Sequence, residues 1–297
     1  EKTPSFTVVE DKGFYHCFGC GAHGDVISFV MQTEGLSFPE AVEKLAAEAG
    51  LEVPKPSPQA REAETRRKGL IEVVEAACAF FQRELAAAGG ARARDYLTGR
   101  GLSAQTVERF RLGYAPGQRG ALTRALKAEG IEEAQLLAAG LAKRGDDGSL
   151  REYFFDRVIF PIADRRGRVV AFGGRTLGDG QPKYLNSPDS DLFHKGRLLY
   201  NLAGARQAVR DGQPLVVVEG YMDVIALAQA GIEGGVAPLG TAVTEEQIAE
   251  LWRLADEPVL CLDGDNAGRR AALRAAGRAL PLLQPGRSLR FAFLPPG

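Results

Sequence analysis

Two acidic residues follow an apolar stretch near the end of the chain and could bind a metal ion. The segment LCLDGDNAGRR spans residues 260–270, and Asp263 and Asp265 stand directly after its apolar residues. Two carboxylates about 5 Å apart repel by roughly 3 kcal/mol at an effective dielectric constant near 20. A divalent cation would offset this repulsion, and Mg²⁺ prefers oxygen ligands. The simpler alternative is that Asp265 or Asn266 caps the following helix.

Two further carboxylates extend this pattern. Glu219 ends the apolar run LVVVE at 215–219, and Asp223 comes one helical turn later. Ligands bind at the carboxyl ends of the strands in an open parallel sheet, where neighbouring strand ends meet at one edge. We therefore predict that Glu219, Asp263 and Asp265 hold a hard divalent ion, with Asp223 in support. Such an ion keeps coordination positions open for phosphate oxygens.

The elements that must position these acids alternate between strand and helix. Strands are predicted at 215–219, 234–240, 258–265 and 289–295, and helices at 221–231, 244–255 and 266–280. Thr244 and Gln247 fit a capping box at the start of the second helix. This alternation indicates right-handed crossovers and a parallel sheet. Cys261 lies within the third strand, where we expect it to pack in the interior.

The middle of the chain predicts a mixed α+β subdomain. From Gly69 onward apolar residues recur at steps of three and four, which defines one apolar helix face, and helical segments continue to about residue 144. Cys78 lies on this face and is expected to be a core residue. Two apolar runs within 156–175 flank a turn rich in charge and glycine, which predicts a β-hairpin.

The first 53 residues are rich in glycine and aromatic residues and carry a metal-binding pattern. FTVVE and GFYHCFGC predict two strands, and two helical segments follow, the second stopping at Gly50. The proline-rich segment 54–68 predicts a linker. Cys17 and Cys20 have the spacing of a zinc half-site, although a redox pair or a chance match remains open for this pattern alone. Four cysteines in 297 residues do not suggest a disulfide framework, so a reducing cytosol is expected.

Charge is distributed unevenly, although the net charge is only −1. Residues 92–127 contain eight basic and two acidic residues, whereas residues 213–266 contain one basic and ten acidic residues. This separation suggests one surface for a polyanion and another for cations, with two solvated faces as the plain alternative. Scattered cations and aromatics before the acidic region suit single-stranded nucleic acid. The candidate cations are Arg109, Arg111, Arg157, Arg175, Lys183, Lys195 and Arg197, and the interleaved aromatics are Tyr184, Phe193 and Tyr200. The chain has no apolar run long enough for a membrane span and no opening signal peptide.

Three stretches resemble one family in the same order. EGYMDVIAL (219–227) and DGDNAGRRAA (263–272) resemble the TOPRIM domain, and EGYMDV is close to the variant in bacterial DNA primases. Residues 173–202 resemble the primase polymerase core, and residues 15–31 resemble the primase zinc-binding domain. The resemblance implies a multidomain α+β and α/β chain with a Rossmann-type parallel sheet. The implied divisions are a partial zinc-ribbon domain (1–53), a linker (54–68), the amino-terminal core subdomain (69–205) and an incomplete TOPRIM domain (206–297).

The resemblance also implies an activity, namely synthesis of short RNA primers on single-stranded DNA from NTPs. Catalysis would use Mg²⁺ or Mn²⁺ held by Glu219, Asp263 and Asp265, with Asp223 supporting. Lys183 and Lys195 would contact the triphosphate, with Tyr184 and Asn186 beside the first lysine. The basic residues Arg109, Arg157 and Arg175 would contact template DNA.

Further expectations follow from the family pattern. Cys17 and Cys20 would bind structural Zn²⁺ in the intact protein, with two ligands from a segment preceding Glu1, and His23 would be a turn residue. Because the chain lacks an initial Met and stops after an apolar run, we expect a fragment. A helical bundle and a helicase-binding domain would follow, which implies the replicative helicase as a partner. The alternatives are a zinc-dependent single-strand binding module without catalysis, or another TOPRIM enzyme such as a nuclease.

Overall fold

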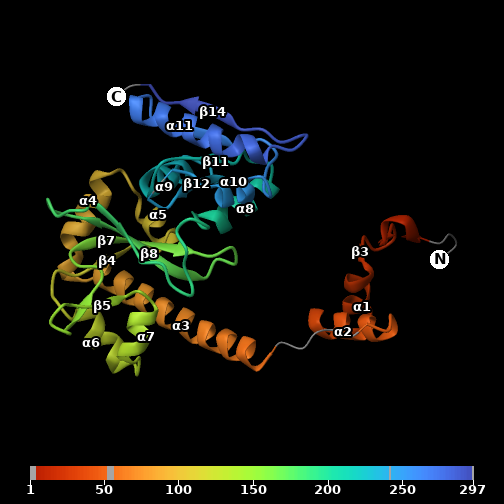
Figure 1. Cartoon of the computed structure of the whole chain (residues 1–297), viewed down its shortest axis with the longest axis horizontal. Coiled ribbons are helices and arrows are strands. Elements are labelled where there is room, and N and C mark those ends of the chain that lie inside the picture. The colour runs from red at the N-terminus through yellow and green to blue at the C-terminus, as the bar shows by residue number, and fades with distance from the viewer. Residues whose placement is uncertain (1–4, 52–56, 241, 296–297) are drawn as a thin grey trace. The chain divides into compact units, whose positions relative to one another are not determined.

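The chain divides into two compact units, which are described separately. The computed structural model describes residues 5–51, 57–240 and 242–295 (Figure 1). The first unit covers residues 1–63 and the second residues 64–297. The domain division expected from sequence separated residues 69–205 from 206–297, and both of these segments lie within the second compact unit.

The first unit is a small antiparallel sheet followed by two helices. Its strands β1 (Phe6–Val9), β2 (Phe14–Cys17) and β3 (His23–Asp25) pair in chain order. A short 3-10 turn, η1 (Glu10–Lys12), joins the first two strands. Helices α1 (Val26–Glu34) and α2 (Phe38–Glu48) follow. The two predicted strands and two predicted helices are confirmed, whereas β3 was missed because its sequence, HGD, has no apolar alternation.

A long helix opens the second unit and begins inside the expected linker. Helix α3 spans Pro58–Ala86, so residues 58–68 are helical. Residues 54–56 of that prediction lie outside the described residues. Proline was counted as a helix breaker, but proline is tolerated in the first helical turn, where its missing N–H has no intrahelical partner.

A four-stranded antiparallel sheet forms the centre of the second unit. Its order is β4 (Gly113–Ala115), β7 (Arg157–Ala163), β8 (Val169–Thr176) and β9 (Tyr184–Asn186). The predicted hairpin is therefore confirmed. The surrounding elements are η2 (Ala88–Gly90), α4 (Ala91–Gly99), α5 (Ala104–Arg109), α6 (Ala121–Ala128), α7 (Glu133–Ala138), β5 (Ala142–Arg144) and β6 (Leu150–Glu152).

Both faces of the β7–β8 hairpin are buried. On one face Ile159 and Phe172 pack in a core with Phe81 of α3. On the other face Val158 and Phe160 pack in a core that includes Tyr221, Met222, Val224 and Ile225. This burial explains why the hairpin sequence is apolar at consecutive positions instead of alternating with polar residues.

A second sheet of five strands completes this unit, in the order β10-β12-β11-β13-β14. The strands are β10 (Leu199–Tyr200), β11 (Val216–Val217), β12 (Gly235–Pro238), β13 (Val259–Leu262) and β14 (Arg290–Phe293). All neighbours pair in parallel except β10 and β12. The helices are α8 (Leu202–Arg210), α9 (Tyr221–Gln229), α10 (Glu245–Leu251), α11 (Asn266–Ala279) and the 3-10 turn η3 (Leu280–Leu282). The predicted α/β alternation is confirmed.

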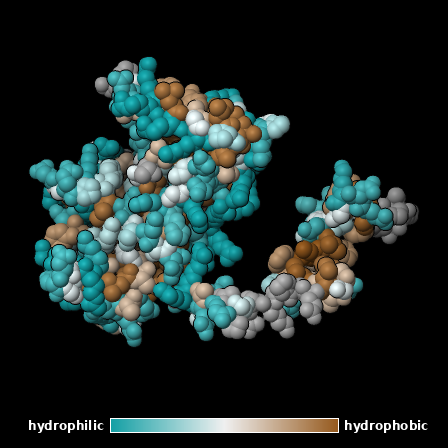
Figure 2. Space-filling view, viewed as in Figure 1, coloured by the Kyte–Doolittle hydropathy of each residue, from teal (hydrophilic) through white to brown (hydrophobic). Residues whose placement is uncertain are grey.

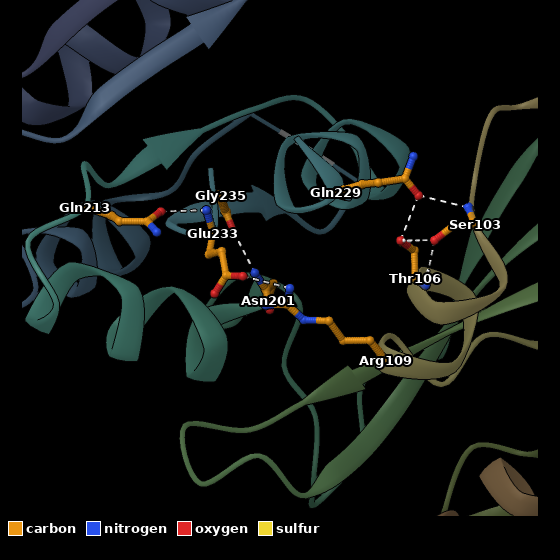
Figure 3. A network of polar contacts seen from close by, with 8 residues as sticks. All are labelled: Ser103, Thr106, Arg109, Asn201, Gln213, Gln229, Glu233 and Gly235. Atoms are coloured by element: carbon orange, nitrogen blue, oxygen red, sulfur yellow. Dashed lines mark hydrogen bonds and ion pairs between the residues drawn. The ribbon is translucent and has the colours of Figure 1, made fainter. Parts of the chain in front are cut away.

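Polar contacts join the five-stranded sheet to the helices of the core subdomain (Figure 3). The Gln229 side-chain oxygen accepts hydrogen bonds from the Ser103 backbone N–H at 2.9 Å and the Thr106 hydroxyl at 2.7 Å. Its amide nitrogen donates to the Gly101 carbonyl at 2.8 Å. These bonds fix α9, and with it the residues at the start of that helix, against α5.

Hydrophobic side chains lie exposed around α11, η3 and β14. Figure 2 shows them in the upper part of the view, where these elements lie. Leu273, Leu280 and Leu294 are at least half exposed. No helix within the described ranges is both long and apolar enough to cross a membrane.

Candidate active site

Two strand ends bring three carboxylates to one edge of the parallel sheet. Glu219 follows β11 and Asp263 follows its parallel neighbour β13. The Asp263 backbone N–H donates to Glu219 Oε1 at 3.1 Å. Glu219, Asp223 and Asp263 line a common cavity of about 240 Å³. The structure therefore brings together the acids that lie 44 positions apart in the sequence.

Asp223 is held toward this cavity by the start of α9. The Gly220 backbone N–H donates to Asp223 Oδ2 at 3.0 Å. Desolvation by the surrounding protein raises the pKa of Asp223, the Gly220 bond opposes this, and the Asp263 charge raises it further. The positive charge of Arg100 acts in the lowering direction. A bound cation would act in the same direction as Arg100, because it would oppose the rise in the Asp223 pKa that desolvation and the Asp263 charge cause.

Arg100 is a residue that the sequence reasoning missed. Its charge acts both on Asp223 and on the Tyr96 hydroxyl, so this exposed arginine contributes to the electrostatics of the carboxylate edge. It stood in the basic segment 92–127, but nothing in its local pattern separated it from the other arginines.

Asp265 differs from the other three acids. Its Oδ1 accepts the backbone N–H groups of Ala267 and Gly268, both at 2.8 Å, so Asp265 is the N-cap of α11. It is not among the residues that line the cavity. Gly268 permits this close helix start, since a Cβ there would lie 2.1 Å from the Asp263 carbonyl oxygen. The capping alternative considered for Asp265 is therefore observed.

The carboxylate edge fits a hard divalent ion as an open, partial ligand set. All its donors are oxygens, as Mg²⁺ prefers, and that ion usually keeps several waters alongside one or two carboxylates. Within the described part of the chain, no three acidic, cysteine or histidine side chains form a ready-made metal cage. The arrangement suits an ion that shares its coordination with substrate and water.

Cys261 packs against the core that contains Val224 and Ile225, in line with the prediction, and it also lies at this edge. Its side chain is half-buried and lines the same cavity as Glu219 and Asp223. Burial raises the pKa of the Cys261 thiol, and the charges of Asp223 and Asp263 add to this effect. The thiol is therefore kept neutral. The strand position was predicted correctly, and the cavity beside this part of β13 leaves the side chain partly exposed.

The two lysines expected to bind triphosphate are available at the surface. Lys183 precedes β9 and Lys195 lies in the loop before β10, and both are exposed. Among the described residues, neither ammonium has a carboxylate within 4.0 Å. Two cations without counter-ions remain free to attract an anionic ligand.

Arg157 supports the Lys183 segment from within. It is buried, and its Nη1 donates to the carbonyls of Pro182 at 3.0 Å, Gly174 at 3.3 Å and Lys183 at 3.4 Å. Burial lowers the pKa of Arg157. The guanidinium is thus committed to the protein, which corrects its expected exposure to DNA. The sequence could not reveal this, because the carbonyl partners come from two other segments.

The Lys195 loop is anchored by the capping box of α10. Gln247 is almost fully buried, and its Nε2 donates to the carbonyls of Leu198 at 2.7 Å and Lys195 at 3.1 Å. The Thr244 hydroxyl donates to the Gly196 carbonyl at 2.6 Å. The predicted capping box is confirmed, and its side chains also fix the loop that carries a candidate phosphate-binding lysine.

Tyr184 and Asn186 occupy different environments on β9. Tyr184 is exposed, whereas Asn186 is half-buried and its Oδ1 accepts the Tyr221 hydroxyl at 2.5 Å. The Tyr184 and Tyr221 ring centroids are 6.3 Å apart. Tyr184 is therefore free to contact a ligand, while the Asn186 oxygen is used to join β9 to α9.

Arg109 and Arg175 are both engaged by neighbouring side chains. Arg109 Nη1 lies 2.9 Å from Glu233 Oε1 in the network of Figure 3. Arg175 lies over the Tyr96 ring, with its Cζ 4.3 Å from the centroid. Arg175 remains half-exposed beside β9. The structure favours Arg175 over Arg109 as a surface for a nucleic-acid strand, because Arg109 already has a counter-ion.

The cysteine pair lies at the tip of the β2–β3 hairpin in the first unit. Cys17 ends β2, and its carbonyl accepts the Gly21 N–H at 2.8 Å in a tight turn. Hydrogen bonds from Cys20, Ser5 and Gly19 lower the pKa of the Cys17 thiol to about 7. The donors suit zinc, but only this pair is in place among the described residues, because no third histidine, cysteine or acid joins it. His23 begins β3, just after the turn.

Three family models match the chain in succession. The CHC2 zinc finger matches residues 1–61, the N-terminal domain of the DNA primase catalytic core matches residues 80–206, and the Toprim domain matches residues 213–292. The carboxylate edge thus belongs to a Toprim domain, and the cysteine hairpin to a zinc finger.

Known relatives agree with this assignment over the whole chain. A DNA primase from Pasteurella multocida is 48% identical over 301 residues, covering 100% of this chain and 51% of the relative. A DNA primase domain structure from Pseudomonas aeruginosa has 49% identity and a TM-score of 0.72, covering 77% of this chain and 72% of that one. A DnaG primase catalytic domain bound to ssDNA has 45% identity and a TM-score of 0.71, covering 79% and 76%.

The fold and site define a Toprim protein with an attached zinc-finger module. The chain spans about half the length of the curated relatives it matches. With these matches in place, the chain belongs to the bacterial DNA primase family.

Proposed function

We propose that this chain is the template-directed RNA-synthesising part of a DNA primase, which makes short primers on single-stranded DNA from NTPs. The observation that carries the proposal is the meeting of Glu219, Asp223 and Asp263 at one strand edge. The exposed lysines Lys183 and Lys195 lie on segments tied to the same Toprim domain. A relative whose structure is titled as a catalytic domain bound to ssDNA supports the choice of template.

The proposed reaction joins a primer or nucleotide 3′-hydroxyl to the α-phosphate of the next NTP and releases pyrophosphate. Bound Mg²⁺ or Mn²⁺ would lower the pKa of the hydroxyl and stabilise charge on the attacking and leaving oxygens. Glu219, Asp263 and Asp223 would hold it, and Asp265 would contribute through its second carboxylate oxygen. Lys183 and Lys195 would neutralise the triphosphate, and Tyr184 would pack beside it.

The chain's own residues set the positions needed for this reaction. Arg157 fixes the backbone of Lys183, and Gln247 fixes that of Lys195. The hydrogen bond between Tyr221 and Asn186 places β9 beside the helix that starts after Glu219. Transfer of a nucleotidyl group depends mainly on such positioning and on electrostatic stabilisation of the phosphates.

The Glu219→Gln variant tests the proposal. Glutamine keeps the acceptor oxygen for the Asp263 N–H but removes the charge, so we expect primer synthesis to fall by at least about 100-fold. The assay is incorporation of labelled NTPs on a single-stranded template with Mg²⁺. Binding of a labelled oligonucleotide serves as the control and is expected to stay within about twofold.

The alternative activities give different results in the same experiment. A single-strand binding module without catalysis would show no difference between Glu219→Gln and wild type in any assay. A Toprim nuclease would degrade labelled single-stranded DNA with Mg²⁺ and would need no NTPs. Either outcome would overturn the primase proposal.

For the first unit we propose that Cys17 and Cys20 supply half of a structural zinc site. The lowered pKa of Cys17 supports this, because the thiolate is the form that binds metal. Replacing both cysteines with serine should abolish zinc retention by the full-length protein, as measured by metal analysis after dialysis. Retention of zinc by the double variant would contradict the assignment.

A further inference from the structure

Two adjoining hollows on the second unit have Arg or Lys as half of their lining residues. The first has a volume of about 440 Å³ and lies among α3, the β7–β8 turn and the loop before β10. The second, of about 330 Å³, lies against α8 and the end of α10, and Arg165 lines both. We call their basic side chains the arginine belt. Its members are Arg67, Lys68, Arg165, Arg166, Arg168, Arg197, Arg206, Arg210 and Arg253.

The acidic residues of these hollows neutralise only part of the belt. Asp164 Oδ2 is paired with Arg168 at 2.6 Å. Glu250 is buried and pairs with both Arg165 and Arg253. Glu64 lies 3.7 Å from Lys68. The belt therefore keeps a large excess of positive charge.

Five belt arginines have no acidic partner among the described residues. Within that part of the chain, no carboxylate lies within 4.0 Å of them. They are Arg67, Arg166, Arg197, Arg206 and Arg210. All of these are exposed. Like charges gathered without counter-ions repel one another, so an anion that binds them all gains from each.

The belt lies away from the carboxylate edge. Arg210 ends α8 ahead of β11, whereas Glu219 follows β11, so the two residues lie at opposite ends of that strand. Arg165 and Arg166 form the turn between β7 and β8, and Arg175 lies at the other end of β8. The belt is thus remote from the carboxylate edge, although its Arg197 lies in the same loop as Lys195, two positions further on.

The lining favours a phosphate backbone over stacked bases or an acidic peptide. No Phe, Tyr or Trp of the described chain lines either hollow, so His194 is the single aromatic ring there on which an unpaired base could stack. Leu192 and Leu202 are buried, and the other apolar lining side chains, Ile71, Leu198, Val209 and Leu254, are only partly exposed. Guanidinium groups match phosphate oxygens with two parallel hydrogen bonds.

The buried Glu250 adds preorganisation to the belt. Its carboxylate holds Arg165 from the β7–β8 turn and Arg253 from the segment after α10. Two arginines from different subdomains are thereby fixed side by side before any ligand arrives. Fixing side chains in advance reduces the entropy lost on binding.

We propose that the arginine belt is a second, sequence-independent binding site for the phosphodiester backbone of single-stranded nucleic acid, remote from the carboxylate edge. The inference rests on the proposed function only in that a template strand must be present. A strand bound at both places would be held at two separate sites on the protein. The belt itself takes no part in the chemistry.

The test removes three unpaired belt charges and compares them with three charges elsewhere. The belt variant is R67Q/R166Q/R206Q, and the matched control is R119Q/R274Q/R287Q, which removes the same net charge from other segments. Binding of a fluorescein-labelled oligo-dT of about 30 nucleotides is measured by anisotropy over a series of salt concentrations. Because each of the three arginines is expected to neutralise one phosphate, the slope of log K against log salt should fall by about 2, with about tenfold weaker binding at low salt.

Several outcomes would overturn the proposal that the arginine belt binds single-stranded nucleic acid. These are equal binding by the belt and control variants, no binding of oligo-dT by the wild-type chain, or belt-dependent binding of polyglutamate without belt-dependent binding of oligo-dT. The last result would assign the surface to an acidic peptide. Thermal unfolding of both variants verifies that they are folded. Because Glu219→Gln is expected to lower synthesis without changing any belt residue, failure of the catalytic proposal is distinguished from failure of the belt proposal.

Discussion

The Tyr221 hydroxyl donates to Asn186 Oδ1 at 2.5 Å and joins strand β9 of the four-stranded sheet to helix α9. Tyr221 is the first residue of α9 and stands two positions after Glu219. Its ring stacks on Phe160 with centroids 4.9 Å apart and meets Tyr200 edge-on at 4.8 Å. One side chain therefore fixes the strand of Tyr184 relative to the carboxylate edge.

Gly173 should be required for this contact. A Cβ at Gly173 would lie 2.4 Å from the Tyr221 ring, so Gly173→Ala is expected to lower the free energy of unfolding by about 1–3 kcal/mol. Tyr221→Phe, which removes only the hydroxyl, should cost about 1 kcal/mol. Urea unfolding measures both, and a Gly173→Ala protein as stable as wild type would contradict the packing described here.

Asp265 has a capping role that can be separated from metal binding. Asp265→Ala should lower the free energy of unfolding by about 1 kcal/mol, whereas Asp265→Ser should keep most of the cap. Since serine lacks the charge, we expect the serine variant to be stable but at least about tenfold slower in primer synthesis. A fully active serine variant would show that Asp265 serves α11 alone.

Gln247 should influence nucleotide binding without touching the nucleotide. Gln247→Met leaves the carbonyls of Lys195 and Leu198 without their donor, which should lower the free energy of unfolding by about 1–3 kcal/mol. The freed loop should raise the KM for NTP severalfold while changing kcat less. Lys195→Met is the comparison, with a raised KM but unchanged stability. An unaltered KM in Gln247→Met would show that the loop is held by other contacts.

The Asp164 carboxylate should contribute to the stability of the fold in a pH-dependent way. Its burial raises the pKa, but hydrogen bonds from the Arg168 side chain and the backbone N–H groups of Arg168 and Arg166 outweigh it, so the pKa is lowered. A carboxylate with a lowered folded-state pKa stabilises the fold above its unfolded pKa of about 3.9. That contribution disappears as the pH falls through the folded value.

The Asp164→Asn variant tests this sign. It should be less stable than wild type at neutral pH, and the difference should shrink as the pH is lowered below about 4. Unfolding by urea at a series of pH values measures the difference. A stability gap that stays constant down to low pH would mean that the loop geometry, not the charge, matters at this position.

The sequence predicted the elements whose periodicity is strong. The α/β alternation after residue 213, the β7–β8 hairpin and the apolar face of α3 were all predicted, because burial on one or two faces leaves a regular apolar pattern. The short strands β3 and β4 leave no such pattern, since three residues cannot show a period. The helical start at Pro58 was missed because composition was weighed above the tolerance of proline at a helix start.

The candidate site was predicted in part for the same reason. Glu219 and Asp263 stand at strand ends, and the rule that parallel strand ends share an edge placed them together. By contrast, the roles of Arg157, Asn186 and Gln247 depend on partners from distant segments. Side-chain contacts between segments far apart in the chain have no local pattern, so these three were either assigned to ligands or read only as a cap.

The β7–β8 hairpin is a wall shared by two hydrophobic cores, one against α3 and the other against α9. If either α3 or α9 unfolded, one apolar face of the β7–β8 hairpin would be exposed to water. Calorimetry on the second unit should therefore record a single endotherm in place of two, since cooperative units share their buried interfaces. The segments that carry Glu219 and Lys183 should therefore unfold in the same thermal transition, so that heating removes the carboxylate edge and the lysine-bearing strand together.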